Sequence, residues 1–191
     1  MVPRFFCDAN GKRAGCACPE GGHPAAFRHD IIRWMKAVIQ RVSEASVTID
    51  GAVHGEIGQG YLILAGFSDE DDESIAERMA EKIRKLRIFE DENGKMNRSI
   101  EDIGGAVLSI SQFTLFADCS HGNRPGFSNA GKPEHAEKLY LYFNSVLREK
   151  GLRVEEGIFG ADMKVRLLND GPVTIVMDSK EILHGPGPKG K

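Results

Sequence analysis

The stretch MKAVIQRVSEASVTIDGAVHGEIG (residues 35–58) predicts the start of a β-sheet. Its first part, residues 35–42, is short and largely apolar, and apolar and polar side chains alternate in residues 45–50, so both parts are predicted strands. Asp50–Gly51 is a hairpin signal that leads into a third strand. With the apolar run of residues 61–67 as a fourth strand, the pattern favours an antiparallel meander.

The rest of the chain adds two main helices and further strands. In residues 69–89 apolar side chains recur every three or four residues, and acidic residues precede basic ones, which is typical of an amphipathic helix. A second helix is predicted over residues 132–151, with Gly151 as its C-terminal stop. Asn93–Gly94 marks a second hairpin. Further strands are predicted over residues 105–116, 161–169 and 173–179, so the fold class is α+β.

The composition is that of one soluble domain. The chain has 191 residues, 28% of them charged, and a net charge of -3, which argues against an indiscriminate nucleic-acid binder. No apolar run approaches the ~20 residues of a membrane helix. Four cysteines, three of them within the first 18 residues, make no disulfide framework and suit a reducing cytoplasm. We therefore expect a soluble cytoplasmic protein.

The two ends of the chain differ from its middle. Residues 1–34 lack periodicity and are predicted to be a disordered or appended leader, and residues 183–191, rich in Gly and Pro, a disordered tail. The spacing C-x8-C-x-C-x4-H-x5-H in the leader leaves a zinc site as an alternative, although structural sites normally pair cysteines two to four residues apart. Residues 35–182 are predicted to form the single domain.

Common catalytic signatures are absent from the sequence. It has no G-x-S-x-G, no P-loop, no G-x-G-x-x-G after a strand and no H-E-x-x-H. His54, His121 and His135 lie far apart in polar contexts, which favours surface roles. The acidic run of residues 69–73 is read as charge at a helix N-terminus. We therefore predict no metal site in the domain and no cofactor.

Two segments could carry chemistry. SQFTLFAD (residues 111–118) places Ser111, Gln112 and Thr114 in a predicted buried strand, where polar groups need partners. The alternative is that the hydroxyls bond neighbouring backbone and Gln112 faces solvent. NDGPVT (residues 169–174) interrupts a β-rich stretch with Gly171–Pro172, for which a plain turn is the alternative. Composition alone leaves both segments open.

Together the two segments resemble the paired motifs of the D-aminoacyl-tRNA deacylase family, also called D-tyrosyl-tRNA deacylases. The resemblance continues in MKAVIQRVSEASVTIDG, RIFEDENGKMN, RPGFSNAG and FGADMKVRLLNDGPVT, and so extends from about Met35 to Asp178. It implies a homodimer with a barrel-like β-structure and helices packed outside. It also implies hydrolysis of the ester in D-aminoacyl-tRNA, and in glycyl-tRNA mischarged on tRNA-Ala, while L-aminoacyl-tRNA is left intact. The partner would be the 3′ end of aminoacyl-tRNA, with no membrane and no DNA.

The resemblance also implies roles for single residues. Backbone N–H groups around Ser111, Gln112 and Phe113 would form an oxyanion hole. Thr114 is a candidate nucleophile, but no base is placed to activate it, and assistance by the tRNA 2′-hydroxyl is favoured. In the family the Gly-Pro bond is cis and enters the partner's site. The residues expected to bind substrate and select its chirality, or to support the segment that does, are Gly171, Pro172, Val173, Thr174, Asn169, Arg41 and Gln40.

Phe159 and Met163 match the family segment before the second motif and are candidates for the adenosine site. A core role is the alternative for both, since apolar residues near a strand are usually core. Two other functions stay open: a related deacylase with a trans Gly-Pro bond that accepts L-Ala on the wrong tRNA, and an inactive protein that binds tRNA ends.

Overall fold

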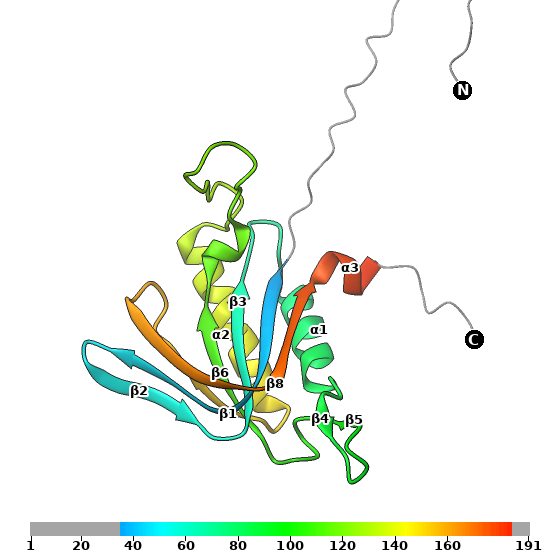
Figure 1. Cartoon of the computed structure of the whole chain (residues 1–191). Coiled ribbons are helices and arrows are strands. Elements are labelled where there is room, and N and C mark those ends of the chain that lie inside the picture. Colours follow the sequence, from blue (N-terminus) through cyan, green and yellow to red (C-terminus); the bar gives the residue numbers. More distant parts are fainter. Residues whose placement is uncertain (1–34, 185–191) are drawn as a thin grey trace, which may run out of the picture. The chain divides into compact units, whose positions relative to one another are not determined.

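The computed structural model describes residues 35–184 (Figure 1). The predicted leader with its zinc alternative, and residues 185–191 of the predicted tail, lie outside these residues. In chain order the elements are β1 (Lys36–Ile49), β2 (Ala52–Ile57), β3 (Gly60–Gly66), α1 (Glu73–Arg84), β4 (Phe89–Glu90), β5 (Met96–Arg98), β6 (Ala106–Ser111), the 3₁₀ helix η1 (Phe113–Phe116), α2 (Pro133–Glu149), β7 (Arg153–Glu156), β8 (Met163–Asp178) and α3 (Ser179–His184).

The main sheet has the order β2-β1-β3-β6-β7, and β8 also pairs with β1. Strand β1 is antiparallel to β2, β3 and β8, whereas β3–β6 and β6–β7 are parallel. The expected antiparallel meander is therefore wrong as a description of the whole sheet, which is mixed. The parallel pairs arise because α1 and α2 lie between β3 and β6 and between β6 and β7, and such crossovers return the chain in the same direction.

Two long strands of the structure each correspond to two shorter predicted strands. Residues 35–42 and 45–50 form one strand, β1, and residues 161–169 and 173–179 form β8. Both strands carry irregular register around residues 41–44 and 169–174, where the sequence resembles a turn. Pairing between β1 and β8 resumes on both sides of these irregularities, so each remains one long strand.

The sheet curves into a nearly closed barrel (Figure 1). The edge of β1 that faces away from β8 is shared: residues 36–42 pair with β3 and residues 45–49 pair with β2. Strand β2 then bends back toward β7, where the Arg153 guanidinium donates to the Glu56 carbonyl at 3.4 Å. Gly55 permits this approach, because a β-carbon there would lie 3.3 Å from Cβ of Glu155.

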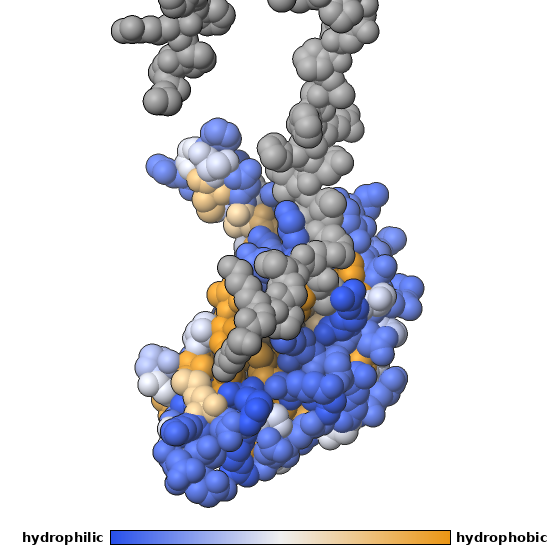
Figure 2. Space-filling model, turned by 90° about the vertical axis from the view of Figure 1, so that its right-hand side faces the viewer, coloured by the Kyte–Doolittle hydropathy of each residue, from blue (hydrophilic) through white to orange (hydrophobic). Residues whose placement is uncertain are grey.

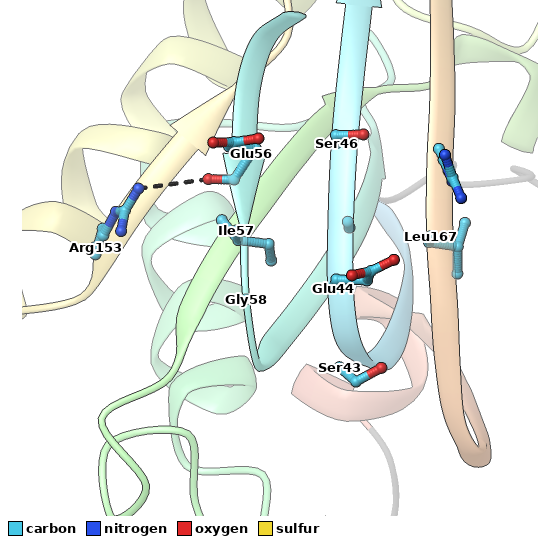
Figure 3. A pocket seen from close by; sticks show the side chains of 10 residues that line it. Ser43, Glu44, Ser46, Glu56, Ile57, Gly58, Arg153 and Leu167 are labelled. Atoms are coloured by element: carbon cyan, nitrogen blue, oxygen red, sulfur yellow. Dashed lines mark hydrogen bonds between the residues drawn. The ribbon is translucent and has the colours of Figure 1, made fainter.

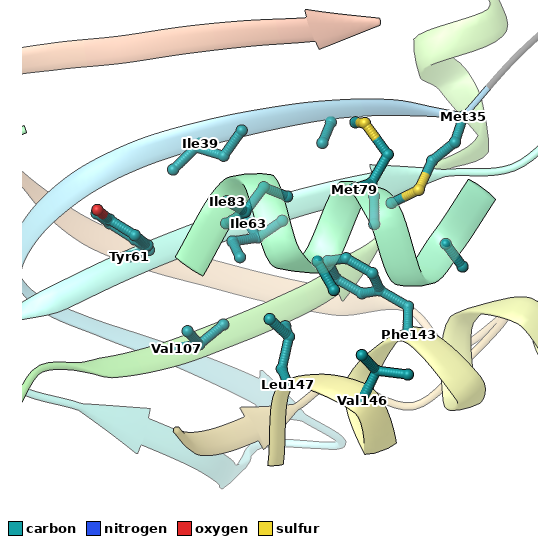
Figure 4. Packing of buried hydrophobic residues seen from close by; sticks show 14 of the residues in the cluster. Met35, Ile39, Tyr61, Ile63, Met79, Ile83, Val107, Phe143, Val146 and Leu147 are labelled. Atoms are coloured by element: carbon teal, nitrogen blue, oxygen red, sulfur yellow. The ribbon is translucent and has the colours of Figure 1, made fainter. Parts of the chain in front are cut away.

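Two hydrophobic clusters fill the two faces of the sheet. The first packs helices against strands and includes Met35, Ile39, Ile63, Met79, Ile83 and Phe143 (Figure 4). The second lies inside the curve of β1, β2 and β8 and includes Val42, Val47, Leu62, Leu108 and Ile110. Strands β3 and β6 are covered on both faces, which explains their almost continuous apolar sequences.

Helix α1 is shorter than predicted, and the described chain has a further helix, α3. Helix α1 begins after Asp72, whose side chain accepts from the Ile75 N–H at 2.9 Å, and it ends at Arg84, so the predicted bounds of 69–89 are too wide. Helix α3 was not predicted, because six residues give too short a pattern. No helix among residues 35–184 is long and apolar enough to cross a membrane.

Candidate active site

The NDGPVT segment forms a bulge in β8. Gln40 pairs with Thr174 and Val42 pairs with Asn169, so residues 170–173 of β8 stand opposite Arg41 alone. Gly171 has φ +127°, in the region that L side chains rarely adopt, and the Gly171–Pro172 peptide bond is cis. Both residues are exposed. The bulge therefore presents backbone, rather than side chains, to the outside of the protein.

The Arg41 side chain supports this bulge from within the protein. It is 4% exposed, and its Nε donates to the Asp170 carbonyl at 2.9 Å. Its Nη1 donates to the Ile88 carbonyl at 2.7 Å, and Nε lies 3.3 Å from Oδ2 of Asp170. A β-carbon on Gly171 would lie 2.9 Å from Arg41 Nη2. Arg41 thus holds the position of the bulge and also requires glycine at residue 171.

Asn169 and Thr174 close the base of the bulge. The Asn169 Oδ1 accepts from the Val173 N–H at 2.8 Å, and its Nδ2 donates to the Val173 carbonyl at 3.3 Å and to Thr174 Oγ1 at 3.1 Å. Gln40 Nε2 donates to the same hydroxyl at 3.3 Å. These bonds replace part of the ladder that the bulge interrupts, since they occupy the N–H and carbonyl groups of Val173.

The SQFTL motif lies at the end of a strand, and this corrects the prediction of a continuous strand over residues 105–116. Ser111 is the last residue of β6, and residues 113–116 form η1. The change of structure is allowed by Gly66, where a β-carbon would lie 2.8 Å from the Gln112 carbonyl oxygen. Thr114 is exposed, and its Oγ1 accepts from Gln112 Nε2 at 2.5 Å. The polar residues of this motif are therefore at the surface or half-buried.

The turn leaves two backbone N–H groups without an intrahelical acceptor. The Gln112 N–H donates to the Ala65 carbonyl at 2.8 Å, and the Leu115 N–H to the Gln112 carbonyl at 3.3 Å. The N–H groups of Phe113 and Thr114 come before the first i→i+3 bond of η1. Of the expected oxyanion donors, the Gln112 N–H is thus already bonded to the Ala65 carbonyl, whereas the Phe113 N–H has no acceptor within the turn.

A cleft of about 320 Å³ joins this motif to the predicted adenosine residues. Its lining includes Ser111, Gln112, Phe113, Phe159 and Met163. Phe159 and Met163 are also partly buried against the two hydrophobic clusters, so each combines a core contact with an exposed surface in the cleft.

Phe127, which is not among the predicted site residues, lies beside Phe113 of this cleft. The two rings meet edge to face with centroids 5.1 Å apart, and the side chains are 57% (Phe113) and 39% (Phe127) exposed. The segment RPGFSNAG contains Phe127, but only its contact with Phe113, which lies 14 positions earlier, indicates a place in the site. Exposed aromatic rings of this kind can stack on nucleic-acid bases.

The two motifs do not share a cleft within one chain. Thr174 lies in the same row of the sheet as Gln40, Leu62 and Leu108, and Ser111 is three residues beyond Leu108. Three strand spacings of ~4.8 Å and three residues of ~3.3 Å each separate the motifs by ~17 Å along the sheet. The lining of the cleft at Ser111 also includes no residue of the NDGPVT segment.

A larger cavity than this cleft lies elsewhere in the described part of the chain (Figure 3). It has a volume of about 500 Å³ and is bordered by β1, β2 and β8 together with Arg153. Two carboxylates, Glu44 and Glu56, line it with two guanidiniums, Arg153 and Arg166. The charges of the two signs balance, and no residue of either motif lines this cavity. Its size alone therefore does not make it the catalytic site.

Ionisable groups are few around the two motifs. The cleft lining holds one carboxylate, Asp162, and no histidine. Beside Arg41, burial raises the pKa of Tyr61, so its hydroxyl stays neutral and donates to the Leu86 carbonyl at 3.1 Å. Within residues 35–184 no three His, Cys, Asp or Glu side chains lie together as a metal site. The chemistry available in the cleft is therefore chiefly that of backbone amides and positioned neutral groups, whereas at the bulge the ionisable groups are Arg41 and Asp170.

Known proteins resemble this chain over most of its length. Residues 38–178 match the family described as D-Tyr-tRNA(Tyr) deacylase. A D-aminoacyl-tRNA deacylase from Thermus aquaticus is 58% identical over 147 residues, which cover 77% of this chain and 97% of that protein. Another from Bacillus cytotoxicus is 58% identical over 146 residues, 76% of this chain and 100% of that protein.

Two solved structures share the fold. One, titled "c-Myc DNA Unwinding Element Binding Protein", is 44% identical with a TM-score of 0.71 and covers 75% of this chain and 97% of its own. The other, a probable eukaryotic D-amino acid tRNA deacylase, is 16% identical with a TM-score of 0.65 and covers 75% and 98%, which supports the fold alone. From the match to residues 38–178 and the identity of 58% to full-length relatives, this chain belongs to the D-Tyr-tRNA(Tyr) deacylase family.

Proposed function

We propose that this protein hydrolyses the ester bond of D-aminoacyl-tRNA, releasing the D-amino acid and free tRNA. Its relatives at 58% identity carry the name D-aminoacyl-tRNA deacylase. The observation that carries the proposal for this chain is the bulge at Gly171–Pro172, exposed at its tip and tied to Arg41 and Asn169 at its base. A rigid backbone surface of this kind suits recognition of the groups around an α-carbon.

The proposed site is shared between two copies of the chain. The ~17 Å separation of the motifs along the sheet supports a site that needs a second chain. The bulge is flanked on β8 by Leu168 and Val176, which are 57% and 74% exposed, and large exposed apolar side chains favour an interface. On the face that Figure 2 views, hydrophobic surface lies beside hydrophilic surface. In a homodimer the bulge of one subunit would enter the cleft of the other.

Chiral selection follows from the backbone of the bulge. With the α-amino group and α-carbon of the substrate against Gly171 and Pro172, an L side chain would point into the bulge and a D side chain away from it. The bulge is held by a buried contact to Arg41, so moving it aside would break this contact and cost free energy. Glycine has no side chain, so glycyl-tRNA would be accepted as well.

Hydrolysis would rely on position and electrostatics. The N–H groups of Phe113 and Thr114 are the donors available for the oxyanion. Thr114 receives a hydrogen bond from the Gln112 amide N–H, which cannot take up a proton, so this threonine is poorly placed as a nucleophile. The 2′-hydroxyl of the terminal adenosine, held in the cleft near Phe159 and Met163, would assist the attack of water. Such positioning is worth several kcal/mol, of the order of 7–11 kcal/mol in the best intramolecular cases.

The experiment is a comparison of D-Tyr-tRNA with L-Tyr-tRNA. Purified protein should deacylate the D-ester and leave the L-ester at its spontaneous rate. Equal rates would contradict chiral selection and favour the relaxed deacylase, for which mischarged L-Ala-tRNA is the substrate to test next. Binding of tRNA without any hydrolysis would indicate the inactive tRNA-end binding protein.

A second candidate function is binding to a DNA element, because the structure at 44% identity carries that title. Its test is competition. Duplex DNA added in excess should leave the deacylation rate unchanged if the cleft is specific for the tRNA 3′ end. Inhibition by duplex DNA at concentrations similar to those of tRNA would support a shared nucleic-acid surface.

A further inference from the structure

The start of the described chain is bound by a buried carboxylate. The backbone nitrogen of Met35 donates to Oδ1 of Asp71 at 2.6 Å, and both residues are almost completely buried. The Met35 side chain lies in the helix-side hydrophobic cluster near Met79 (Figure 4), and its carbonyl accepts from the Ser179 N–H at 3.0 Å. The nitrogen, the side chain and the carbonyl of Met35 are therefore each held by the domain, which fixes the position of the nitrogen.

The other partners of the Asp71 carboxylate are neutral. Its Oδ2 accepts from the Ser68 N–H at 2.7 Å and from Ser68 Oγ at 3.0 Å. Burial raises the pKa of Asp71 to about 6 against the effect of these hydrogen bonds, and the charge of Glu70 raises it further. His135 lies nearby, but its Nε2 contacts the Asp71 backbone carbonyl at 2.9 Å. Among the described residues no lysine or arginine forms an ion pair with Asp71.

We propose that Asp71 and Ser68 form a binding site for a free α-ammonium group on Met35, so that the active form of the protein begins at this residue. An α-ammonium has three N–H donors and a positive charge at the atom where an internal residue has one amide N–H. It would neutralise the buried carboxylate, and charge-assisted hydrogen bonds are roughly twice as strong as neutral ones. The site thus recognises the chemical difference between a chain start and an internal peptide bond.

Two routes would generate this group. Translation can start at the Met35 codon, or an endopeptidase can hydrolyse the Trp34–Met35 bond before the domain folds and buries Met35. In that hydrolysis water adds across the amide and leaves a carboxylate on Trp34 and the ammonium on Met35. In either case the long side chain of Lys36 disfavours removal of Met35, since initiator methionine is normally removed only before a small residue. One relative has no counterpart of the remaining residues of this chain: the protein from Bacillus cytotoxicus is matched over its full length by 146 residues.

The first test compares three forms of the protein: the full chain, residues 35–191 with a free α-amine, and residues 35–191 with an acetylated α-amine. In urea at pH 7 the free-amine form should have an unfolding equilibrium constant ~10-fold lower than the acetylated form, the size of one charged hydrogen bond. Asp71→Asn should remove most of this difference. An equal constant in the free and acetylated forms, or a difference that persists in Asp71→Asn, would overturn the proposal.

A second measurement needs no variant. The α-amine of Met35 should react with acetic anhydride at pH 7 at least ~10-fold more slowly than the same amine in the unfolded chain. The Asp71 carboxylate raises the pKa of the amine, and burial limits access of the reagent. Reaction at the rate of the unfolded chain would contradict the proposed contact.

Mass spectrometry of the protein from its own cells then identifies its first residue. A chain beginning at Met35 supports the proposal, and recovery of only the full-length chain overturns it. Met35→Leu separates the two routes. The short form disappears if translation starts at residue 35, and it persists, beginning at Leu, if an endopeptidase generates it.

Discussion

The Arg41 guanidinium occupies the space that a side chain on Gly171 would need. An ideal β-carbon at Gly171 lies 2.9 Å from Arg41 Nη2 and 2.7 Å from Cγ2 of Val173, at a φ of +127°. The buried Arg41 side chain thus packs directly against the exposed residue Gly171. Substitutions at either position should therefore affect both stability and activity.

Gly171→Ala should lower deacylation of D-Tyr-tRNA by ~10-fold or more and cost about 1–3 kcal/mol of unfolding free energy, because the new β-carbon displaces Arg41 and strains the backbone. Single-turnover deacylation and urea unfolding measure the two effects. The matched control is Gly94→Ala in the β4–β5 turn, where φ is +71° but nothing lies within 4 Å of the added carbon. This variant should lose unfolding free energy because of the strained backbone, but it should keep full activity. Equal activity of the two variants would contradict the role of the bulge.

Arg41→Lys should destabilise the protein by ~2–3 kcal/mol, although the charge is retained, because a single nitrogen replaces the two separate nitrogens, Nε and Nη1, that donate to the Asp170 and Ile88 carbonyls. Activity should fall with it, since the bulge loses its support. Arg153→Lys is the control: this arginine bonds the Glu56 carbonyl at the surface, and its replacement should change stability by ~0.5 kcal/mol or less. A similar small change for both variants would show that Arg41 is dispensable.

Thr114→Ala should retain activity within ~10-fold, because Gln112 cannot accept the hydroxyl proton and no base contacts Thr114 Oγ1 in the described part of the chain. Replacing the terminal 2′-hydroxyl of the tRNA with hydrogen should lower the rate by ~100-fold or more. Both rates are measured under single-turnover conditions. The reverse pattern, with an inactive but folded Thr114→Ala and a fully reactive 2′-deoxy substrate, would assign the chemistry to threonine.

Local sequence signals predicted the turns and helices well. Asp50 and Gly51 both have positive φ, 50° and 81°, and Gly94 has φ 71°, as the two hairpin signals require. The mixed sheet was not predicted, because whether β6 runs parallel to β3 depends on the path of α1 between them. Likewise, the long strands β1 and β8 were each divided in two, since a bulge and a turn share the same residue types.

Long-range contacts explain what the sequence could not reveal about the site. The resemblance to a family singled out Arg41, but the Ile88 carbonyl that it contacts lies 47 positions away. Phe127 was missed because its contact with Phe113 depends on the loop between them, which is closed by the bridge of Asp118 and Gly126. Residue type therefore identified the motifs, and only their folding showed that they are apart in one chain.

Asp71 predicts an unusual dependence of stability on pH. Its folded pKa of about 6 exceeds the ordinary value, so between about pH 4 and 6 the folded state holds a proton that the unfolded state has lost. This contribution is therefore stabilising at low pH and is lost as the pH rises through 6. Relative to Asp71→Asn, the unfolding free energy of the full chain should fall by ~2–3 kcal/mol from pH 4 to 7.

The control for this titration is Asp102→Asn. Hydrogen bonds from Ser99 lower the pKa of Asp102, so its contribution should be lost as the pH falls, the opposite direction. Parallel curves for Asp71→Asn and the unmodified chain between pH 4 and 7 would show that the buried carboxylate is not perturbed.

A mixing experiment tests whether two subunits share each site. Gly171→Ala impairs the bulge, and Phe113→Pro impairs the cleft by removing an N–H donor, so each homodimer should keep at most about a tenth of normal activity. Random exchange makes half of the dimers mixed, and each mixed dimer has one site with a normal bulge and a normal cleft, which restores about a quarter of normal activity. If each chain held a whole site, mixing would restore nothing. Because the ~17 Å between the motifs argues against a site within one chain, we expect activity to return in the mixture, and to do so only after subunit exchange.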